Sequence, residues 1–428
     1  MKIIVMGAGL MGVTTAWYLA EGGHEVTVID RRDGVARETS FANAGMIAPG
    51  HSYSWASPRA PMLLLKSLFG ADTALRFRFK ADPRMWAWSL RFLANCTTAR
   101  NRANTLVKVK LNIYSREALI ALRRETGIAY DETAKGALYL FRDKQHLETG
   151  LTNMAMLNEH GIGLTALDPE GIATLEPALA HFKARLAGAI YAPQDESGDA
   201  FVFTEKLAEL CRARGVTFQF GTTVTGIATE GDRIAGVITE RGRLSAGGYV
   251  LALGSYSPLV ARGLAVKMPV YPIKGYSVTI PTAGFNGAPT IPGVDEGNLI
   301  AFCRMGDKLR LTATADFAGY DTGYEAKDFA PMLHSMRSRL ASGPIQPAAS
   351  SGQPAGDGAA NGVCPSSASE PMSLSVSPSK VVRRRAEVTR SCGDFTLASG
   401  SAQASGDAIT ARVSSPRSPS VSRNTRAR

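Results

Sequence analysis

The chain has 428 residues, of which 45% are hydrophobic and 20% charged, and its formal net charge is +11. This length predicts two domains, because a single hydrophobic core stops growing at roughly 250–300 residues. Part of the positive charge lies in residues 341–428, which carry ten Lys and Arg against five Asp and Glu. No basic stripe alternates with aromatic residues, so we expect no nucleic-acid partner.

The same composition bears on location. No apolar run reaches the roughly 18–20 residues that a membrane-spanning helix needs. A buried-type strand, Ile3 to Met6, begins at once, which leaves no room for a signal peptide. The five cysteines show neither CxxC spacing nor partner histidines, so we expect no disulfide framework and no metal site. These features predict a cytoplasmic protein, or one on the cytoplasmic face of the inner membrane.

Residues 1–30 have the pattern of a dinucleotide-binding β-α-β unit. Gly7, Gly9 and Gly12 form a G-x-G-x-x-G turn after an apolar strand, and Asp30 ends the next strand. Such glycines permit a tight turn, close approach of the pyrophosphate and helix-strand packing, while the acidic residue accepts ribose hydroxyls. The residues predicted to form this cofactor site are Ile3, Ile4, Val5, Met6, Gly7, Ala8, Gly9, Leu10, Met11, Gly12, Val13, Thr14, Thr15, Ala16, Trp17, Asp30 and Arg31. The unit alone does not distinguish NAD from FAD.

The segment that follows favours FAD. After Asp30 the chain does not continue with regular β-α units but with small and polar residues from Thr39 to Gly45. Small residues let backbone N–H groups approach a flat ring system, and Ser40 or Asn43 could bond its heteroatoms. An ordinary surface loop is the alternative interpretation.

Residues 83–95 predict an amphipathic helix. Its Trp86, Trp88 and Leu93 would either pack in the core of an inserted domain or touch a membrane.

The nucleotide-binding unit resumes near residue 200. "TEKLAELCRARG" predicts a helix capped by Thr204 and ended by Gly215, and the apolar run Tyr249 to Leu253 predicts a buried central strand. This strand ends at Gly254, in a turn that exposes backbone. A nucleotide-binding domain interrupted by a second domain is typical of FAD enzymes more than of NAD enzymes.

Four motifs in order, "GAGLMGVTTAWYLAEGGHEVTVIDR", "ETSFANAGMIAPG", "DESGDAFVFTEKLAELC" and "YPIKGYSVTIP", resemble the bacterial FAD-dependent D-amino acid dehydrogenases of the small-subunit type. These belong to the D-amino acid oxidase-like flavoprotein superfamily. The likeness runs from Met1 to about Leu340. It implies FAD as cofactor and the oxidation of D-amino acids, D-alanine among them, to imino acids that hydrolyse to 2-oxo acids and ammonia. It also implies a quinone or another electron-transfer acceptor and possible peripheral contact with the inner membrane.

The resemblance also implies roles for individual residues. Ser40, Asn43 and Gly45 would lie near the ribityl chain and the flavin ring. Val224 would place backbone against adenine, and Gly254 would lie on the closing strand. In "PVYPIKGYSVTIP", Tyr271 and Tyr276 would contact substrate or flavin, and Lys274 would favour the reduced, anionic ring. An edge strand with core tyrosines and an exposed lysine is the alternative for this segment.

The amino-acid composition of the chain changes near Ala341. The segment up to residue 428 is rich in Ser, Ala, Gly, Pro and Arg, which predicts disorder because little apolar surface can be buried. The family continues here with motifs that this chain lacks, and a frame-shifted reading of GC-rich DNA would produce this mixture of residues. Without that region we expect poor flavin binding and slow turnover.

Together these features predict an α/β fold in which a discontinuous Rossmann-like FAD-binding domain carries an inserted α+β substrate domain. The FAD-binding domain would comprise residues 1–60 and 195–262, the substrate domain 61–194 and 263–340, and the low-complexity tail 341–428. Alternatives are an oxidase of the same superfamily acting on glycine, sarcosine or a cyclic imino acid, and an inactive remnant of the fold.

Overall fold

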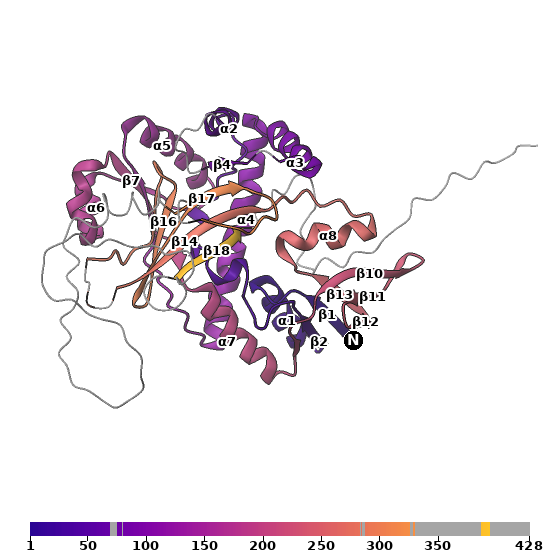
Figure 1. Cartoon of the computed structure of the whole chain (residues 1–428). Coiled ribbons are helices and arrows are strands. Elements are labelled where there is room, and N and C mark those ends of the chain that lie inside the picture. The colour runs from indigo at the N-terminus through magenta and orange to yellow at the C-terminus, as the bar shows by residue number, and fades with distance from the viewer. Residues whose placement is uncertain are drawn as a thin grey trace, which may run out of the picture.

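The computed structural model describes residues 1–68, 75–78, 80–282, 284, 287–325, 328–329 and 387–393 (Figure 1). The strands of this part of the chain form sheets of four, three, nine and two strands. Figure 1 shows the four-stranded and three-stranded sheets close together, with the nine-stranded sheet on the other side of the molecule.

The four-stranded sheet is parallel and contains both ends of the discontinuous unit. Its strands, in spatial order, are β13 (Gly248–Leu251), β1 (Lys2–Met6), β2 (Glu25–Ile29) and β9 (Thr217–Gln219). Since all four run the same way, the turn after β1, the end of β2 and the turn after β13 meet at one edge of the sheet. This is the edge at which ligands bind in open α/β sheets.

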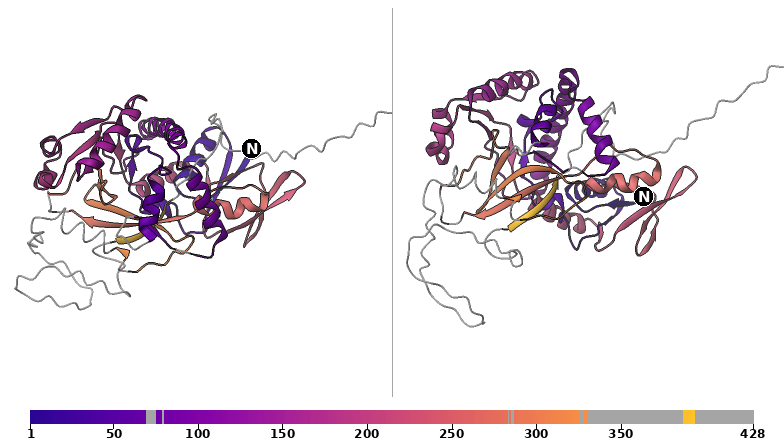
Figure 2. Two further views of the ribbon diagram at one scale, coloured as in Figure 1. Left: turned by 90° about the horizontal axis from the view of Figure 1, so that it is seen from above. Right: turned by 45° about the horizontal axis from the view of Figure 1, so that its top comes forward.

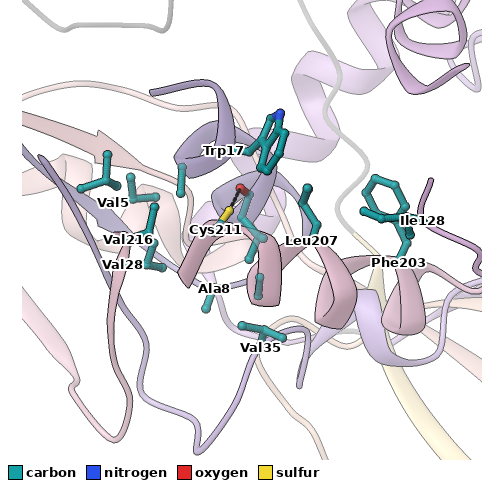
Figure 3. Close-up of a cluster of buried hydrophobic side chains, with 14 of the residues drawn as sticks. Val5, Ala8, Trp17, Val28, Val35, Ile128, Phe203, Leu207, Cys211 and Val216 are labelled. Carbon is teal, nitrogen blue, oxygen red and sulfur yellow. Dashed lines mark hydrogen bonds between the residues drawn. The ribbon is translucent and has the colours of Figure 1, made fainter. Parts of the chain in front are cut away.

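One face of this sheet packs against α1 (Leu10–Glu21) and α7 (Ala200–Ala213). Val5 and Val28, which are fully buried, point from the strands toward Leu207 and Cys211 of α7 (Figure 3). Residues at the end of a helix outside this unit also join the cluster, among them Leu122. The alternation along β1 explains the arrangement, because successive side chains of a strand point to opposite faces.

The opposite face packs on the three-stranded antiparallel sheet. Ile4, Met6 and Ile29 form a cluster there with Val237. The strands of this small sheet are β10 (Val224–Glu230), β11 (Arg233–Thr239) and β12 (Gly242–Leu244). The parallel sheet is therefore covered on both faces, as its uninterrupted apolar strands require.

The nine-stranded sheet builds the second part of the molecule. Its strands, in spatial order, are β18 (Glu387–Gly393), β14 (Ile273–Pro281), β17 (Lys308–Phe317), β16 (Ile300–Met305), β15 (Gly293–Asp295), β5 (Ala137–Phe141), β7 (Gly188–Ala192) and β6 (Thr165–Leu167), with β4 (Leu75–Phe77) beside β17. The two-stranded sheet pairs β3 (Met46–Ile47) antiparallel with β8 (Glu196–Ser197).

Helices cover this second part, as the views in Figure 2 show. They are α2 (Ala60–Leu68), α3 (Pro83–Ala94), α4 (Thr98–Thr126), α5 (Lys144–Asn158), α6 (Pro169–Leu175) and the 3-10 helix η3 (Pro177–Arg185). Side chains at the N-caps of α3 to α6 accept backbone N–H groups, which satisfies donors that have no partner inside the helix: Asp82, Thr97, Asp143 and Asp168. The shorter elements are η1 (Thr39–Phe41), η2 (Pro49–His51), η4 (Gly254–Tyr256), α8 (Ser257–Ala261) and η5 (Arg262–Leu264).

This architecture confirms the predicted α/β fold class, with β1 and β2 joined by β9 and β13 after a long interruption. The domain boundaries stay predictions, but one observation bears on them. Leu122, Ile128 and Tyr130, which the prediction gave to the substrate domain, pack in the core beside the parallel sheet. The predicted tail, 341–428, lies outside the described residues except for β18, which pairs antiparallel with β14.

Candidate functional site

The three glycines of the opening turn have different surroundings. Gly7 has φ +108°, and a Cβ there would lie 2.3 Å from the carbonyl oxygen of Ala252. A Cβ at Gly12 would lie 1.8 Å from the carbonyl oxygen of Gly7. At Gly9, by contrast, a Cβ would meet only the Ser40 hydroxyl, at 3.6 Å. Gly7 and Gly12 therefore permit packing, whereas Gly9 faces open space into which a ligand can come close to the backbone.

The acidic residue at the end of β2 braces this turn. One oxygen of Asp30 accepts the N–H of Ala8 at 2.7 Å, and the other accepts the N–H of Arg32 at 2.8 Å. Helix α1 begins at Gly9 without a side-chain cap, while the hydroxyl of Ser40 accepts the N–H of Leu10 at 3.1 Å. A helix N-terminus with backbone N–H groups and no acidic side chain in its first turn is suited to an anion.

The other predicted residues of the first unit lie around this turn. Ile3 is buried. The side chains of most others are buried in the two core clusters beneath the turn: Ile4, Val5, Met6, Ala8, Val13, Ala16 and Trp17. The hydroxyls of Thr14 and Thr15 donate to carbonyl groups of α1, and Met11 is exposed.

A polar and aromatic stack, which the sequence did not reveal, adjoins the turn. The guanidinium of Arg31 lies 4.0 Å from the ring centre of Tyr256 and donates to Glu38 at 2.7 Å. The ring of Tyr256 lies 5.3 Å from that of Tyr320, whose hydroxyl donates to the carbonyl of Ser255 at 2.8 Å. Burial alone would raise the pKa of Glu38, but hydrogen bonds from Arg32 and Arg31, and the charges of these two residues, lower it.

Two further predicted residues lie on the same side. Gly254, with φ +54°, begins η4 at the end of β13, so it stands beside the opening turn. Val224 begins β10 and packs, partly buried, against the cluster of Ile4 and Met6.

The segment from η1 to β3 contains the predicted flavin-side residues Ser40, Asn43 and Gly45. The Asn43 side chain accepts the N–H of Gly45 at 3.0 Å, and the carbonyl of Gly45 accepts the N–H of Gly198 at 2.8 Å. Gly45 has φ +68°, and a Cβ there would lie 2.3 Å from both Gly198 and the Met305 side chain. Arg310 of β17 donates to the carbonyl of Phe41 at 3.5 Å. The loop is thus fixed between the nucleotide-binding part and the nine-stranded sheet.

These residues fit the ADP part of FAD. Gly9 offers an open approach to the backbone, α1 presents its N-terminus, and the Asp30 carboxylate stands at the end of β2. The loop from Ser40 to Gly45, with no large side chain except Phe41, leaves backbone available for a flat ring.

The predicted substrate-side residues divide into two places. Lys274 and Tyr276 share one buried carboxylate: the Tyr276 hydroxyl donates to Asp316 at 2.9 Å, and the Lys274 ammonium lies 3.9 Å from the same oxygen. Arg78 closes the cluster at 2.8 Å from Asp316. Burial lowers the pKa of Lys274, opposed by the Asp316 charge. Lys274 is 0% exposed, so the alternative of an exposed edge-strand lysine is wrong.

Tyr271 lies apart from that cluster. It packs with Trp88 and Phe317 in the core under α3, and its ring centre is 6.1 Å from that of Trp88. Burial and the charge of Asp82 raise its pKa to about 12.

A second buried polar cluster was not predicted. Asp195 accepts the Tyr139 hydroxyl at 2.5 Å and the N–H of Gly50 at 2.8 Å. Burial raises the pKa of Asp195 to about 6. The His51 ring stacks on Tyr139, with centres 4.8 Å apart, and bonds to Glu296 at 2.8 Å. Burial would lower the pKa of His51, but the Glu296 charge raises it. Spacing could not find this cluster, because its members come from four distant segments.

Comparison with known proteins identifies the family. The model of the FAD-dependent oxidoreductase family, DAO, matches residues 2–400. The chain belongs to this family of FAD-dependent oxidoreductases. D-amino acid dehydrogenase 2 of Mesorhizobium japonicum is 44% identical over 338 residues, which cover 79% of this chain and 81% of the relative. D-amino acid dehydrogenase of Rhizobium johnstonii is 47% identical over 320 residues, 75% of this chain and 77% of the relative.

Solved structures share the fold at low identity. Glycine oxidase from Bacillus cereus superposes with a TM-score of 0.56 at 20% identity, covering 78% of this chain and 77% of its own. L-α-glycerophosphate oxidase from Mycoplasma pneumoniae, with FAD bound, gives a TM-score of 0.57 at 16% identity, covering 79% and 78%. The predicted cofactor, FAD, is confirmed at the level of the family by the match over residues 2–400.

Proposed function

We propose that this FAD-dependent oxidoreductase deaminates D-amino acids oxidatively. The observation that carries the proposal is the 43–47% identity with relatives named D-amino acid dehydrogenase, over three quarters or more of the chain. Oxidation of the Cα–N bond gives an imino acid, which water converts to a 2-oxo acid and ammonia. The alternative, an oxidase acting on glycine, sarcosine or a cyclic imino acid, is supported only by fold similarity at 20% identity or less.

The chain's own residues would divide the work as follows. Gly7, Gly9 and Asp30 would hold the ADP part of FAD by backbone approach and by the carboxylate. Ser40, Asn43 and Gly45 would shape the flavin side. Bound FAD supplies the two-electron acceptor chemistry.

Groups of β14 would face the substrate in this proposal. The charge of Lys274 is balanced by Asp316, whose carboxylate lies 3.9 Å from the lysine ammonium. A buried cation of this kind would stabilise a flavin ring that gains negative charge. We therefore assign Lys274 to the flavin and Tyr276 to positioning Asp316 between the two cations. Tyr271 would contact the substrate or the flavin from its place in the core under α3.

Electrons would leave to a quinone, an acceptor that resides in the bilayer. The enzyme would then work at the cytoplasmic face of the inner membrane, in peripheral contact with it. Within the described residues no helix is long and apolar enough to cross a membrane.

The decisive experiment is an absorbance spectrum of the purified protein before and after anaerobic addition of D-alanine. Flavin bands that bleach with D-alanine, and not with glycine or sarcosine, support the proposal. Bleaching with glycine alone would favour the oxidase. Hydrogen peroxide formed in air without added quinone or dye would contradict the dehydrogenase assignment.

We also propose that residues 341–428 are a frame-shifted reading of the family's C-terminal region. The support is compositional, since Ser, Ala, Gly, Pro and Arg dominate this segment. Sequencing the gene tests it: the proposal fails if no other reading frame restores an arginine-containing family segment. We expect a chain of this sequence to bind less than one FAD per molecule.

A further inference from the structure

We propose that helices α2 and α3 form the surface by which this protein binds an anionic lipid bilayer. The proposal rests on the peripheral membrane contact of the proposed function and names the surface responsible. Figure 1 shows the two helices side by side at the top of the molecule. Both pack inward on one cluster, with Ala60 and Leu64 from α2 and Met85, Trp88 and Phe92 from α3.

Helix α3 is apolar on its outer side as well. Trp86, Leu90 and Leu93 are 44%, 69% and 42% exposed. They are spaced i, i+4 and i+7, so they form one stripe along the helix. Met85, Trp88 and Phe92 form the inner stripe. The sequence left core and membrane open as alternatives for this helix. Trp88 belongs to the core, whereas Trp86 and Leu93 are exposed.

Helix α2 adds a second apolar surface. Met62, Leu63 and Leu65 are 58%, 45% and 48% exposed. Isolated exposed apolar residues are normal on proteins, but six on two adjoining short helices are a patch that calls for a partner. Helices of this length lie in the interface of a bilayer and do not cross it.

Charge identifies the partner. From residue 59 to residue 100 the chain carries eight Lys and Arg, two Asp and no Glu. At the start of α3, a surface depression of about 620 Å³ is lined by Lys80, Arg84 and Arg262 together with Asp82, which pairs with Arg84 at 3.0 Å. Four of these cations pair with Asp residues: Arg76 with Asp328, Arg78 with Asp316, Lys80 with Asp321 and Arg84 with Asp82. Arg59 and Arg100 donate instead to uncharged groups, the Thr149 hydroxyl and the carbonyl of Ala94. The positive charge that remains beside exposed Leu, Met and Trp matches anionic headgroups above acyl chains. A second copy of the same face would bring like charges together.

Trp86 has the orientation expected of an interfacial residue. Its indole N–H donates to the carbonyl of Lys80 at 3.1 Å, so the polar edge is satisfied while 44% of the residue stays exposed. Tryptophan is enriched where one side of a ring is apolar and the other polar, as at the membrane interface.

Vesicle co-sedimentation of the purified full chain tests the proposal. The vesicles contain phosphatidylcholine alone, or phosphatidylcholine with about 30% of the anionic lipid phosphatidylglycerol. We expect binding to the anionic vesicles that weakens as salt is raised. Leu90→Asp and Met62→Asp should each lower the partition coefficient about tenfold, because a charge replaces an inserted apolar side chain.

The matched control is Leu111→Asp. Leu111 is 59% exposed on helix α4, so it offers the same chemistry outside the proposed surface. It should bind vesicles like the unmodified chain. Equal loss of binding in this variant, or no binding of the unmodified chain at low salt, would overturn the proposal. Self-association that Leu90→Asp abolishes, without vesicle binding, would identify a second copy as the occupant instead. Vesicle binding requires no turnover, so it is independent of the substrate assignment.

Discussion

The opening turn offers a test that separates packing from cofactor binding. In Gly12→Ala the new methyl would stand 1.8 Å from the carbonyl oxygen of Gly7 and 2.9 Å from its carbon, and backbone atoms cannot rotate away. Overpacking of this kind costs about 1–3 kcal/mol, and we expect about 3 kcal/mol here. With an m-value of about 3 kcal/mol per M, the urea midpoint of the variant should fall by about 1 M.

Gly9→Ala is the matched control. Its methyl meets only the Ser40 hydroxyl at 3.6 Å, and Gly9 has φ −73°, which alanine adopts without strain. Loss of an N-cap glycine changes stability by no more than about 1 kcal/mol. Because the methyl occupies the approach to the pyrophosphate, we expect FAD affinity to fall about 10- to 100-fold, the value of a hydrogen bond to a charged group. Urea unfolding and FAD fluorescence quenching measure the two effects. The reasoning is refuted if Gly12→Ala unfolds at the normal midpoint, or if Gly9→Ala binds FAD normally.

The buried ionic groups support three further predictions. Asp316→Ala should destabilise the fold by about 3 kcal/mol in urea unfolding, because Arg78 and Lys274 lose their shared carboxylate. Lys274→Met should slow anaerobic flavin reduction by D-alanine about tenfold, whereas Lys308→Met, at an exposed position of β17, should not. Asp195 has a pKa of about 6 in place of 3.8, so the folded state binds the extra proton. Stability should therefore fall by about 2 kcal/mol as the pH rises from 4 to 6, and Asp195→Asn should remove that fall.

Local patterns predicted the nucleotide-binding part well. The spacing of Gly7, Gly9 and Gly12 fixes a tight turn whatever follows it, and the apolar run ending at Leu253 marks the returning strand. Each of these features depends on residues that are neighbours in the sequence. The order of strands, β13-β1-β2-β9, was not predicted, because it depends on pairing between distant segments.

Contacts between distant segments were beyond the sequence. Asp316 pairs with Arg78 across 238 positions, and Tyr139 with Asp195 across 56. Nothing in a single sequence relates such residues. The same limit applies to the stacking of Arg31 on Tyr256, since either ring or guanidinium alone would pass for an ordinary surface group.

Helix α4 explains why the two parts of the molecule depend on each other. At its start, Asn101 donates to the carbonyls of Ser54 and Ala56, which follow the flavin-side loop. Near its end, Arg123 donates to buried Glu196 at 2.8 Å, and Glu196 lies in β8, which pairs with β3 directly after that loop. One helix of 29 residues therefore fixes, at two points, the chain that follows the loop. Because that loop carries the predicted flavin contacts, we expect packing of the inserted part to influence flavin binding even though the glycine turn lies outside it.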